Sequence, residues 1–179
     1  LHVGVFDGEQ YEEPEEGTVQ GSVLSPVLGN IYLHHVLDQW FERDVVPRLR
    51  GQARLIRYAD DALIGFSQEV DARKVLEALK RRFERYGLRL HPEKTRVVDM
   101  GLAGSHFDFL GYRFHRTKRG RIARLVRPKS LRKLRDSIRA KTLRTNGKCM
   151  RAIAADVNRT LRGWYAYFKH VNTYHMGEI

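Results

Sequence analysis

The sequence predicts an α+β protein, with antiparallel strands backed by helices and then a helical, strongly basic segment. Two apolar, β-prone runs, 54–58 and 62–66, are separated by only three residues, which is typical of a tight β-hairpin. Apolar residues recur at helical spacing on both sides of this hairpin. Strands stop and basic helices begin at Pro128, so we place a domain boundary there, between 1–127 and 128–179.

The first elements are a hairpin and a long helix. Residues 6–11 contain an Asp-Gly pair between short flanks, which predicts a β-hairpin. Ser25 and Pro26 are typical of a helix start, as the N-cap and the first helical residue. Apolar residues at helical spacing extend this helix to about residue 46, and Pro47 ends it.

The remaining elements alternate between helices and strands. An amphipathic helix is expected at 70–86, with Gly87 at its C-terminal cap. Two further helices, separated at Asn146-Gly147, follow the domain boundary. The other expected strands are 88–90, 95–100, 107–114 and 121–126, the last two as a pair.

Composition excludes several classes of protein. The single cysteine, Cys149, excludes a disulfide framework and a zinc site with four thiolates. The sequence shows no membrane-spanning run and no signal peptide, so we expect no membrane partner. The net charge is +12, and residues 105–179 contain nineteen basic residues against four acidic ones. That concentration of charge favours a polyanionic partner such as nucleic acid.

The sharpest chemical feature is the sequence Tyr58-Ala59-Asp60-Asp61 between the two apolar runs. Adjacent carboxylates repel each other unless a cation lies with them, and a tight turn lets both reach one hard cation such as Mg²⁺. Carboxylates of this kind hold the metal ions of two-metal phosphoryl transfer. An ordinary acidic turn is the alternative, and the apolar flanks disfavour it.

This motif resembles the catalytic signature of reverse transcriptases, and the surrounding blocks resemble those of group II intron-encoded reverse transcriptase/maturases in the same order. The blocks are GTVQGSVLSPVLGNIYL at 17–33, GLRL with PEKT at 87–95, FDFLGY at 107–112 and LRGWYAYF at 161–168. The resemblance implies a right-hand polymerase palm, an antiparallel sheet backed by helices, followed by a helical thumb at the start of the maturase region. The family's fingers and first palm carboxylate lie upstream, and we assign Asp7 to the first hairpin instead.

The resemblance also implies roles for particular residues. Asp60 and Asp61 are the expected catalytic ligands of Mg²⁺. The residues expected to contact the nucleotide or template are Gln20, Gly21, Tyr58 and Lys94. Those expected to contact the primer or RNA are Phe109, Leu110, Gly111, Arg132, Arg135, Arg139 and Arg162, the arginines because basic side chains on a helix bind phosphates.

The expected activity is RNA-directed DNA polymerisation, in which a primer 3′-OH attacks the α-phosphate of a deoxynucleoside triphosphate. The expected partners are an RNA template, in particular intron RNA, a DNA primer or target, and dNTP. We expect a cytoplasmic, ribonucleoprotein-associated protein, and the sequence leaves a homodimer open. Without fingers and first carboxylate, the chain alone is expected to be inactive. The alternatives are an RNA-binding maturase module without polymerase activity and a reverse transcriptase of another lineage.

Overall fold

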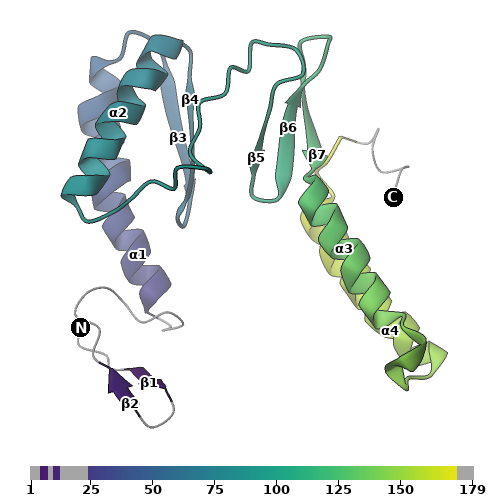
Figure 1. Cartoon of the computed structure of the whole chain (residues 1–179). Helices are drawn as coiled ribbons and strands as arrows, with labels where there is room; N and C mark the ends of the chain where they lie inside the picture. The colour runs from purple at the N-terminus through teal and green to yellow at the C-terminus, as the bar shows by residue number, and fades with distance from the viewer. Residues whose placement is uncertain (1–4, 8–9, 13–23, 173–179) are drawn as a thin grey trace. The chain divides into compact units, whose positions relative to one another are not determined.

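The computed structural model describes residues 5–7, 10–12 and 24–172, and the chain divides into two compact units, Leu1–Val97 and Val98–Ile179. Figure 1 shows the elements of each unit. Helices and strands are mixed, and all strand pairs among the described residues are antiparallel, which confirms the predicted α+β class. In the described part of the chain, no helix is long and apolar enough to cross a membrane.

The first unit begins with the predicted hairpin. Strands β1 (Val5–Asp7) and β2 (Gln10–Glu12) pair in antiparallel register, with Asp7 opposite Gln10. Asp7 is therefore a hairpin residue, as the sequence indicates.

A long helical stretch follows and extends about as far as predicted. It comprises α1 (Ser25–Leu33), the π-helical turns η1 (His34–Asp38) and η2 (Phe41–Val45), and the 3₁₀ turn η3 (Val46–Arg48). The prediction of Ser25 as N-cap is wrong, because the backbone is already helical at Leu24 (φ −83°, ψ −24°), which takes the cap position. Pro26 lies in the first turn, as expected.

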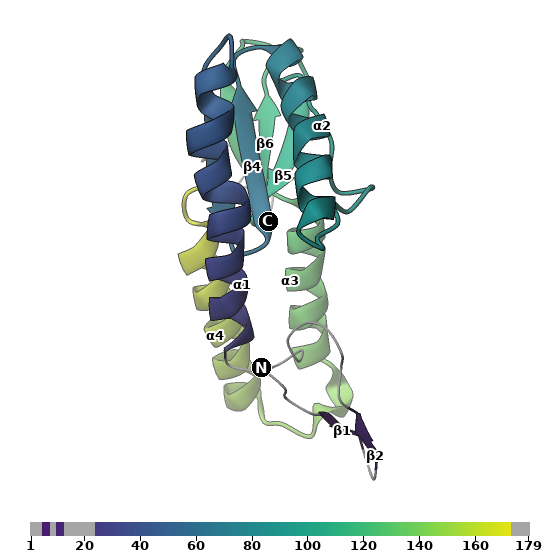
Figure 2. The ribbon, with the colours of Figure 1, turned by 90° about the vertical axis from the view of Figure 1, so that its left-hand side faces the viewer.

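The helices of this unit pack on one face of a two-stranded sheet. Strands β3 (Ala53–Tyr58) and β4 (Asp61–Phe66) pair antiparallel, and α2 (Glu69–Arg85) follows them. Figures 1 and 2 show α2 and the long helical stretch on the same side of β3 and β4. Leu55 of β3 packs against both buried clusters, which contain Val36, Leu37, Leu79 and Phe83 in one and Phe41, Val45 and Val75 in the other.

The strands predicted at 88–90 and 95–100 are wrong, because both segments are irregular in the structure. After Gly87 (φ +66°), the Leu88 N–H donates to the Phe83 carbonyl at 2.8 Å and closes the end of α2. Leu88 and Leu90 then pack against the first buried cluster. Their alternation therefore reflects burial against helices rather than pairing with another strand.

The second unit is a three-stranded sheet joined to a pair of helices. Strands β5 (His106–Phe109), β6 (Tyr112–Arg116) and β7 (Ile122–Val126) lie in the order β5-β6-β7. Helix α3 (Pro128–Lys141), the 3₁₀ turn η4 (Arg144–Asn146) and helix α4 (Met150–Phe168) follow. The pairing of 107–114 with 121–126 is confirmed in its C-terminal half. The single strand predicted over 107–114 is wrong, because the chain reverses at Leu110-Gly111.

Candidate functional site

The two adjacent aspartates lie at the exposed end of the β3–β4 hairpin. Asp60 is in the turn between the strands, and Asp61 is the first residue of β4, opposite Tyr58. Ala59, the other turn residue, has φ +52°. This left-handed conformation costs a residue with a Cβ about 1–2 kcal/mol, so the surrounding structure must hold it. Asp60 and Asp61 are both exposed.

Asp61 faces away from the helices. Residues directly opposite on antiparallel strands share a face, so Asp61 lies on the same face as Tyr58. Leu55 packs against the helices, so the alternate residues Ile56 and Tyr58 point outward, where they are 51% and 67% exposed. Further along the outer face, Gly65 has no atom within 4 Å of where a Cβ would lie. This outer face is open to a large ligand.

The turn is held from the opposite face by Arg57. Its Nε and Nη2 donate to the two carboxylate oxygens of Asp38, at 2.8 and 2.7 Å. Its Nη1 donates to Asn30 Oδ1 at 2.8 Å and to the Ala59 carbonyl at 2.9 Å. The hydrogen bond from Arg57 holds the pKa of Asp38 below its ordinary value. One guanidinium thus joins α1, η1 and the hairpin turn.

The side chains at the end of the hairpin are of a type that binds Mg²⁺, but two carboxylates are too few to hold the ion alone. Mg²⁺ prefers carboxylate oxygens and water, and Asp60 and Asp61 are exposed carboxylates. Among the residues that the structure describes, no group of three or more His, Cys, Asp and Glu side chains could hold a metal ion. The hairpin therefore offers part of a metal site.

The other residues expected around the nucleotide are only partly described. Gln20 and Gly21 lie outside the described residues. Lys94 is exposed on a turn in which its own N–H and that of Thr95 donate to the His91 carbonyl, at 3.2 and 3.0 Å. The structure therefore brings together Tyr58, Asp60 and Asp61 on one hairpin and leaves Lys94 on a separate exposed turn.

The second unit presents Leu110-Gly111 as a tight turn between β5 and β6. Both residues have positive φ, +48° and +80°. The Gly111 carbonyl accepts hydrogen bonds from the Arg127 N–H (3.0 Å) and Ser130 Oγ (3.2 Å) at the start of α3. The Leu110 carbonyl accepts one from the Tyr167 hydroxyl at the end of α4 (2.8 Å). Hydrogen bonds therefore connect this turn to both α3 and α4.

A cluster of aromatic rings packs beneath the same turn. Phe168 is 7% exposed, and its ring centroid lies 5.1 Å from that of Tyr112 and 4.8 Å from that of Trp164. The Tyr112 hydroxyl in turn donates to the Tyr167 carbonyl. In the structure, Phe168 therefore packs the end of α4 against Tyr112 of the sheet, and Trp164 packs against Phe168.

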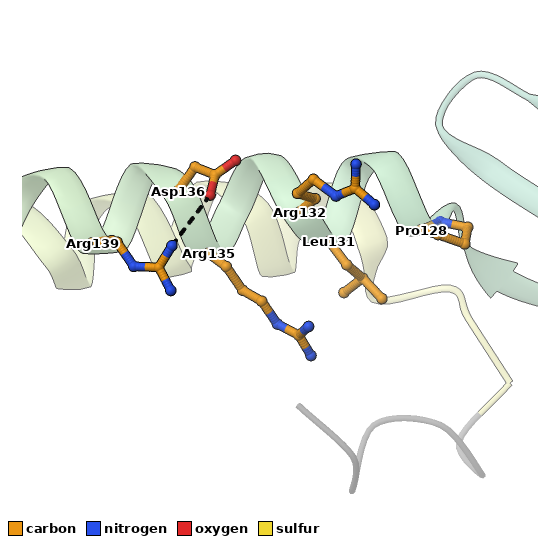
Figure 3. A pocket seen from close by; sticks show the side chains of 6 residues that line it. All are labelled: Pro128, Leu131, Arg132, Arg135, Asp136 and Arg139. Atoms are coloured by element: carbon orange, nitrogen blue, oxygen red, sulfur yellow. Dashed lines mark ion pairs between the residues drawn. The ribbon is translucent and has the colours of Figure 1, made fainter.

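Three of the predicted RNA-binding arginines line one groove along α3. Arg132, Arg135 and Arg139 are exposed and line it together with Pro128, Leu131 and Asp136. Figure 3 shows these side chains along a single helix, with the Arg139–Asp136 ion pair dashed. That pair is 3.9 Å long and exposed on both sides, so it leaves Arg139 accessible to an anion. Arg162 is exposed on α4.

Sequence reasoning missed the residues that hold the two turns. Arg57 had one signal, since a charged residue occupies an inward-facing position of β3 whose other inward-facing residues, Ala53 and Leu55, are apolar. Its partners Asp38 and Asn30, and the contact of Tyr167 with Leu110, have no signal in a single sequence because they join distant segments.

Comparison with known proteins agrees with these features. Residues 4–114 match the family model described as reverse transcriptase (RNA-dependent DNA polymerase). The chain belongs to the reverse transcriptase family. Residues 131–178 match the model of the group II intron maturase-specific domain, which confirms the predicted resemblance.

The curated relatives point the same way. The group II intron-encoded protein LtrA of Lactococcus lactis subsp. cremoris is 32% identical over 92 residues, which cover 46% of this chain and 15% of LtrA. The LtrA sequence of strain MG1363 gives the same values. The match therefore spans only a small part of the relatives' length.

Proposed function

We propose that this chain forms the C-terminal part of the palm (1–127) and the start of the thumb and maturase region (128–179) of a group II intron-type reverse transcriptase. Its reaction is template-directed transfer of a nucleotide from dNTP to a primer 3′-OH. The observation that supports this most directly is the exposed Asp60-Asp61 pair at the end of a hairpin whose outer face is open.

Asp60 and Asp61 are the residues that would bind Mg²⁺. When bound, the ions would supply activation of the primer hydroxyl and charge neutralisation at the transferred phosphate. The described residues provide two such carboxylates, and the proposal requires a further metal ligand beyond them. We expect no primer extension unless that ligand is present.

The outer face of the hairpin is the proposed nucleotide and template site. Tyr58 shares this face with Asp61 and is exposed, so its ring is available to a sugar or base. Gln20, Gly21 and Lys94 are proposed to contact the same substrates, with Lys94 as a point charge toward the triphosphate.

The second unit is the proposed primer and RNA interface. Phe109, Leu110 and Gly111 are proposed to contact the primer strand. Arg132, Arg135 and Arg139 in the α3 groove, with Arg162 on α4, are proposed to neutralise RNA phosphates. Intron RNA is the proposed template and partner, and a ribonucleoprotein the setting in which the protein acts.

A second candidate function is RNA binding as a maturase without DNA synthesis. The match of residues 131–178 to the maturase-specific domain favours it. The intact Asp60-Asp61 pair favours polymerisation, because RNA binding alone does not need paired carboxylates at an exposed turn.

Primer extension tests the proposal. The test needs a longer protein in which the family's fingers and first palm carboxylate precede this chain. We call this longer protein the complete polymerase. It should extend a DNA primer on an RNA template with dNTP, and chelation of Mg²⁺ should stop extension. RNA binding without any extension would refute the proposal and favour the maturase candidate.

A further inference from the structure

We infer that Arg57 is a positioning residue for nucleotidyl transfer, which fixes the Ala59-Asp60 turn through a clamp formed with Asp38 and Asn30. The inference rests on the proposed function, because it assigns Arg57 a role in orienting the proposed metal ligands. We call Arg57, Asp38 and Asn30 the Arg57 clamp. Arg57 itself does not reach the substrate side in this arrangement, since it lies on the inner face of β3.

The clamp satisfies all three guanidinium nitrogens at once. The carboxylate of Asp38 accepts two nearly parallel hydrogen bonds, a fork that restricts both the position and the plane of the guanidinium. The third nitrogen, Nη1, then points at both Asn30 Oδ1 and the Ala59 carbonyl. The Arg57 side chain is only 14% exposed and that of Asp38 22%, so water competes weakly for these bonds.

The bond to Ala59 acts on the part of the backbone that determines where the carboxylates lie. The Ala59 carbonyl belongs to the peptide that links Ala59 to Asp60, and Ala59 has the left-handed φ of +52°. Rotation of this peptide would swing the Asp60 side chain relative to Asp61. The bond from Arg57 opposes that rotation from the side opposite the proposed substrate.

The helical side of the clamp is anchored as well. Asp38 is the last residue of the π-helical turn η1, and π turns occur frequently at functional sites. The carbonyl of Val36 in the same turn accepts a 2.6 Å hydrogen bond from Arg82 Nε of α2. The guanidinium of Arg82 also lies 5.2 Å from the Trp40 ring centroid. A second arginine thus holds the turn that supplies Asp38.

The Arg57 clamp could act as a purely structural ion pair or as a positioning device, and mutation of the clamp would affect stability and activity differently in the two cases. A structural pair lowers stability, and every activity falls in proportion to the folded fraction. A positioning device lowers kcat and raises the Mg²⁺ requirement while primer–template binding stays intact. Displacement of a reacting group by about 1 Å can cost on the order of a hundredfold in rate.

The test uses Arg57→Lys in the complete polymerase. Lysine keeps the charge but cannot form the bidentate fork and reach two further acceptors. We expect kcat to fall about a hundredfold. The Mg²⁺ concentration for half-maximal rate should rise, and KM for the primer–template should stay within about twofold, because Arg57 does not contact the primer–template in this proposal.

Asn30→Ala is the milder variant, which removes one acceptor and leaves the Asp38 pair and the helix intact, since alanine favours helices. It should show the same rise in Mg²⁺ requirement with a smaller fall in kcat. Asp71→Asn is the matched control. Asp71 is 3% exposed and accepts the N–H groups of Arg50 and Gly51, so the variant should lower the melting temperature without changing the Mg²⁺ requirement.

The outcomes separate the inference from the proposed function. If the unmodified complete polymerase shows no extension, the proposed function fails and the inference fails with it. If it is active and both clamp variants keep its Mg²⁺ requirement, or lose activity only as Asp71→Asn does, the inference alone is overturned. A raised Mg²⁺ requirement in both clamp variants, with primer–template KM preserved, supports it.

Discussion

The Tyr167 hydroxyl at the end of α4 donates a 2.8 Å hydrogen bond to the Leu110 carbonyl in the β5–β6 turn. Fifty-seven residues separate the two in sequence. This contact joins α4 directly to the turn that we propose touches the primer. A movement of α4 would therefore be transmitted to that turn.

Tyr167→Phe removes this bond and leaves the ring in place. We expect the free energy of unfolding to fall by about 1 kcal/mol, because one hydrogen bond is lost and the Leu110 carbonyl loses its partner. Urea denaturation measures the change. Tyr165→Phe, on an exposed side chain of the same helix, is the control and should change stability little. Equal effects in the two variants would show that the Tyr167 contact is energetically unimportant.

Gly111→Ala tests why the turn requires glycine. Gly111 has φ +80°, and an added Cβ would lie 3.3 Å from Phe168 Cζ and 3.4 Å from Ser130 Oγ. The left-handed backbone costs alanine about 1–2 kcal/mol, and the tight contacts add to this. Gly104 has φ +86° with nothing within 4 Å, so Gly104→Ala measures the backbone cost alone. Thermal denaturation should rank Gly111→Ala as the less stable variant, and the reverse order would contradict the packing argument.

Asp108 should make stability depend on acid pH. Arg113, opposite it on β6, donates hydrogen bonds that hold the pKa of Asp108 below its ordinary value, and Arg127 lies 3.0 Å away. A lowered pKa in the folded state adds stability above the unfolded value of about 4, and this is lost as the pH falls toward the folded value.

Asp108→Asn removes that contribution. The variant should be less stable than the parent at pH 7, by about 1.5–3 kcal/mol, which is typical of hydrogen bonds to charged groups. The difference in free energy of unfolding between parent and variant should narrow as the pH is lowered below about 4. Urea titrations at a series of pH values measure it, and a gap that does not change with pH would contradict the assignment.

The arginine groove of α3 should determine how RNA affinity depends on salt. Neutralisation of Arg132, Arg135 and Arg139 to Gln should flatten the slope of log affinity against log salt by about two units, since each phosphate contact on a single strand contributes about 0.7. All RNAs should weaken similarly, because phosphate contacts do not read sequence.

The control is neutralisation of the exposed Lys74, Arg81 and Arg85 on α2, which changes the net charge by the same amount. It should leave the slope nearly unchanged. If the α3 variant keeps the parent slope, or if both variants flatten it equally, α3 is not a specific RNA-binding surface.

The parts of the fold that the sequence predicts well are those set by local pattern. The β3–β4 hairpin and α2 follow from alternation and helical periodicity in consecutive residues. The β5–β6 turn was missed because Leu110 is not a usual turn residue, and its positive φ depends on contacts from α3 and α4. Leu88 and Leu90 alternate with Arg89 in the pattern of a strand, but they do so because both leucines pack against the first buried cluster.

The candidate site also contains residues that the sequence predicts and residues that it does not. Asp60 and Asp61 are recognisable from their neighbours in sequence. Their support by Arg57 is not, because Asp38 lies nineteen residues earlier and is brought into place by a π-helical turn that no simple periodicity predicts.

The most direct test of the account compares Asp60→Asn with the unmodified complete polymerase, in primer extension and in RNA binding on the same preparations. Asparagine keeps the shape of the side chain and removes its charge. Loss of several kcal/mol of metal-assisted stabilisation corresponds to a fall in extension rate of at least about a thousandfold. RNA affinity should stay nearly unchanged, because the arginines that we propose bind phosphates lie in the other unit. Extension at the parent rate, or an equal loss of extension and RNA binding, would contradict a catalytic role for the Asp60-Asp61 pair.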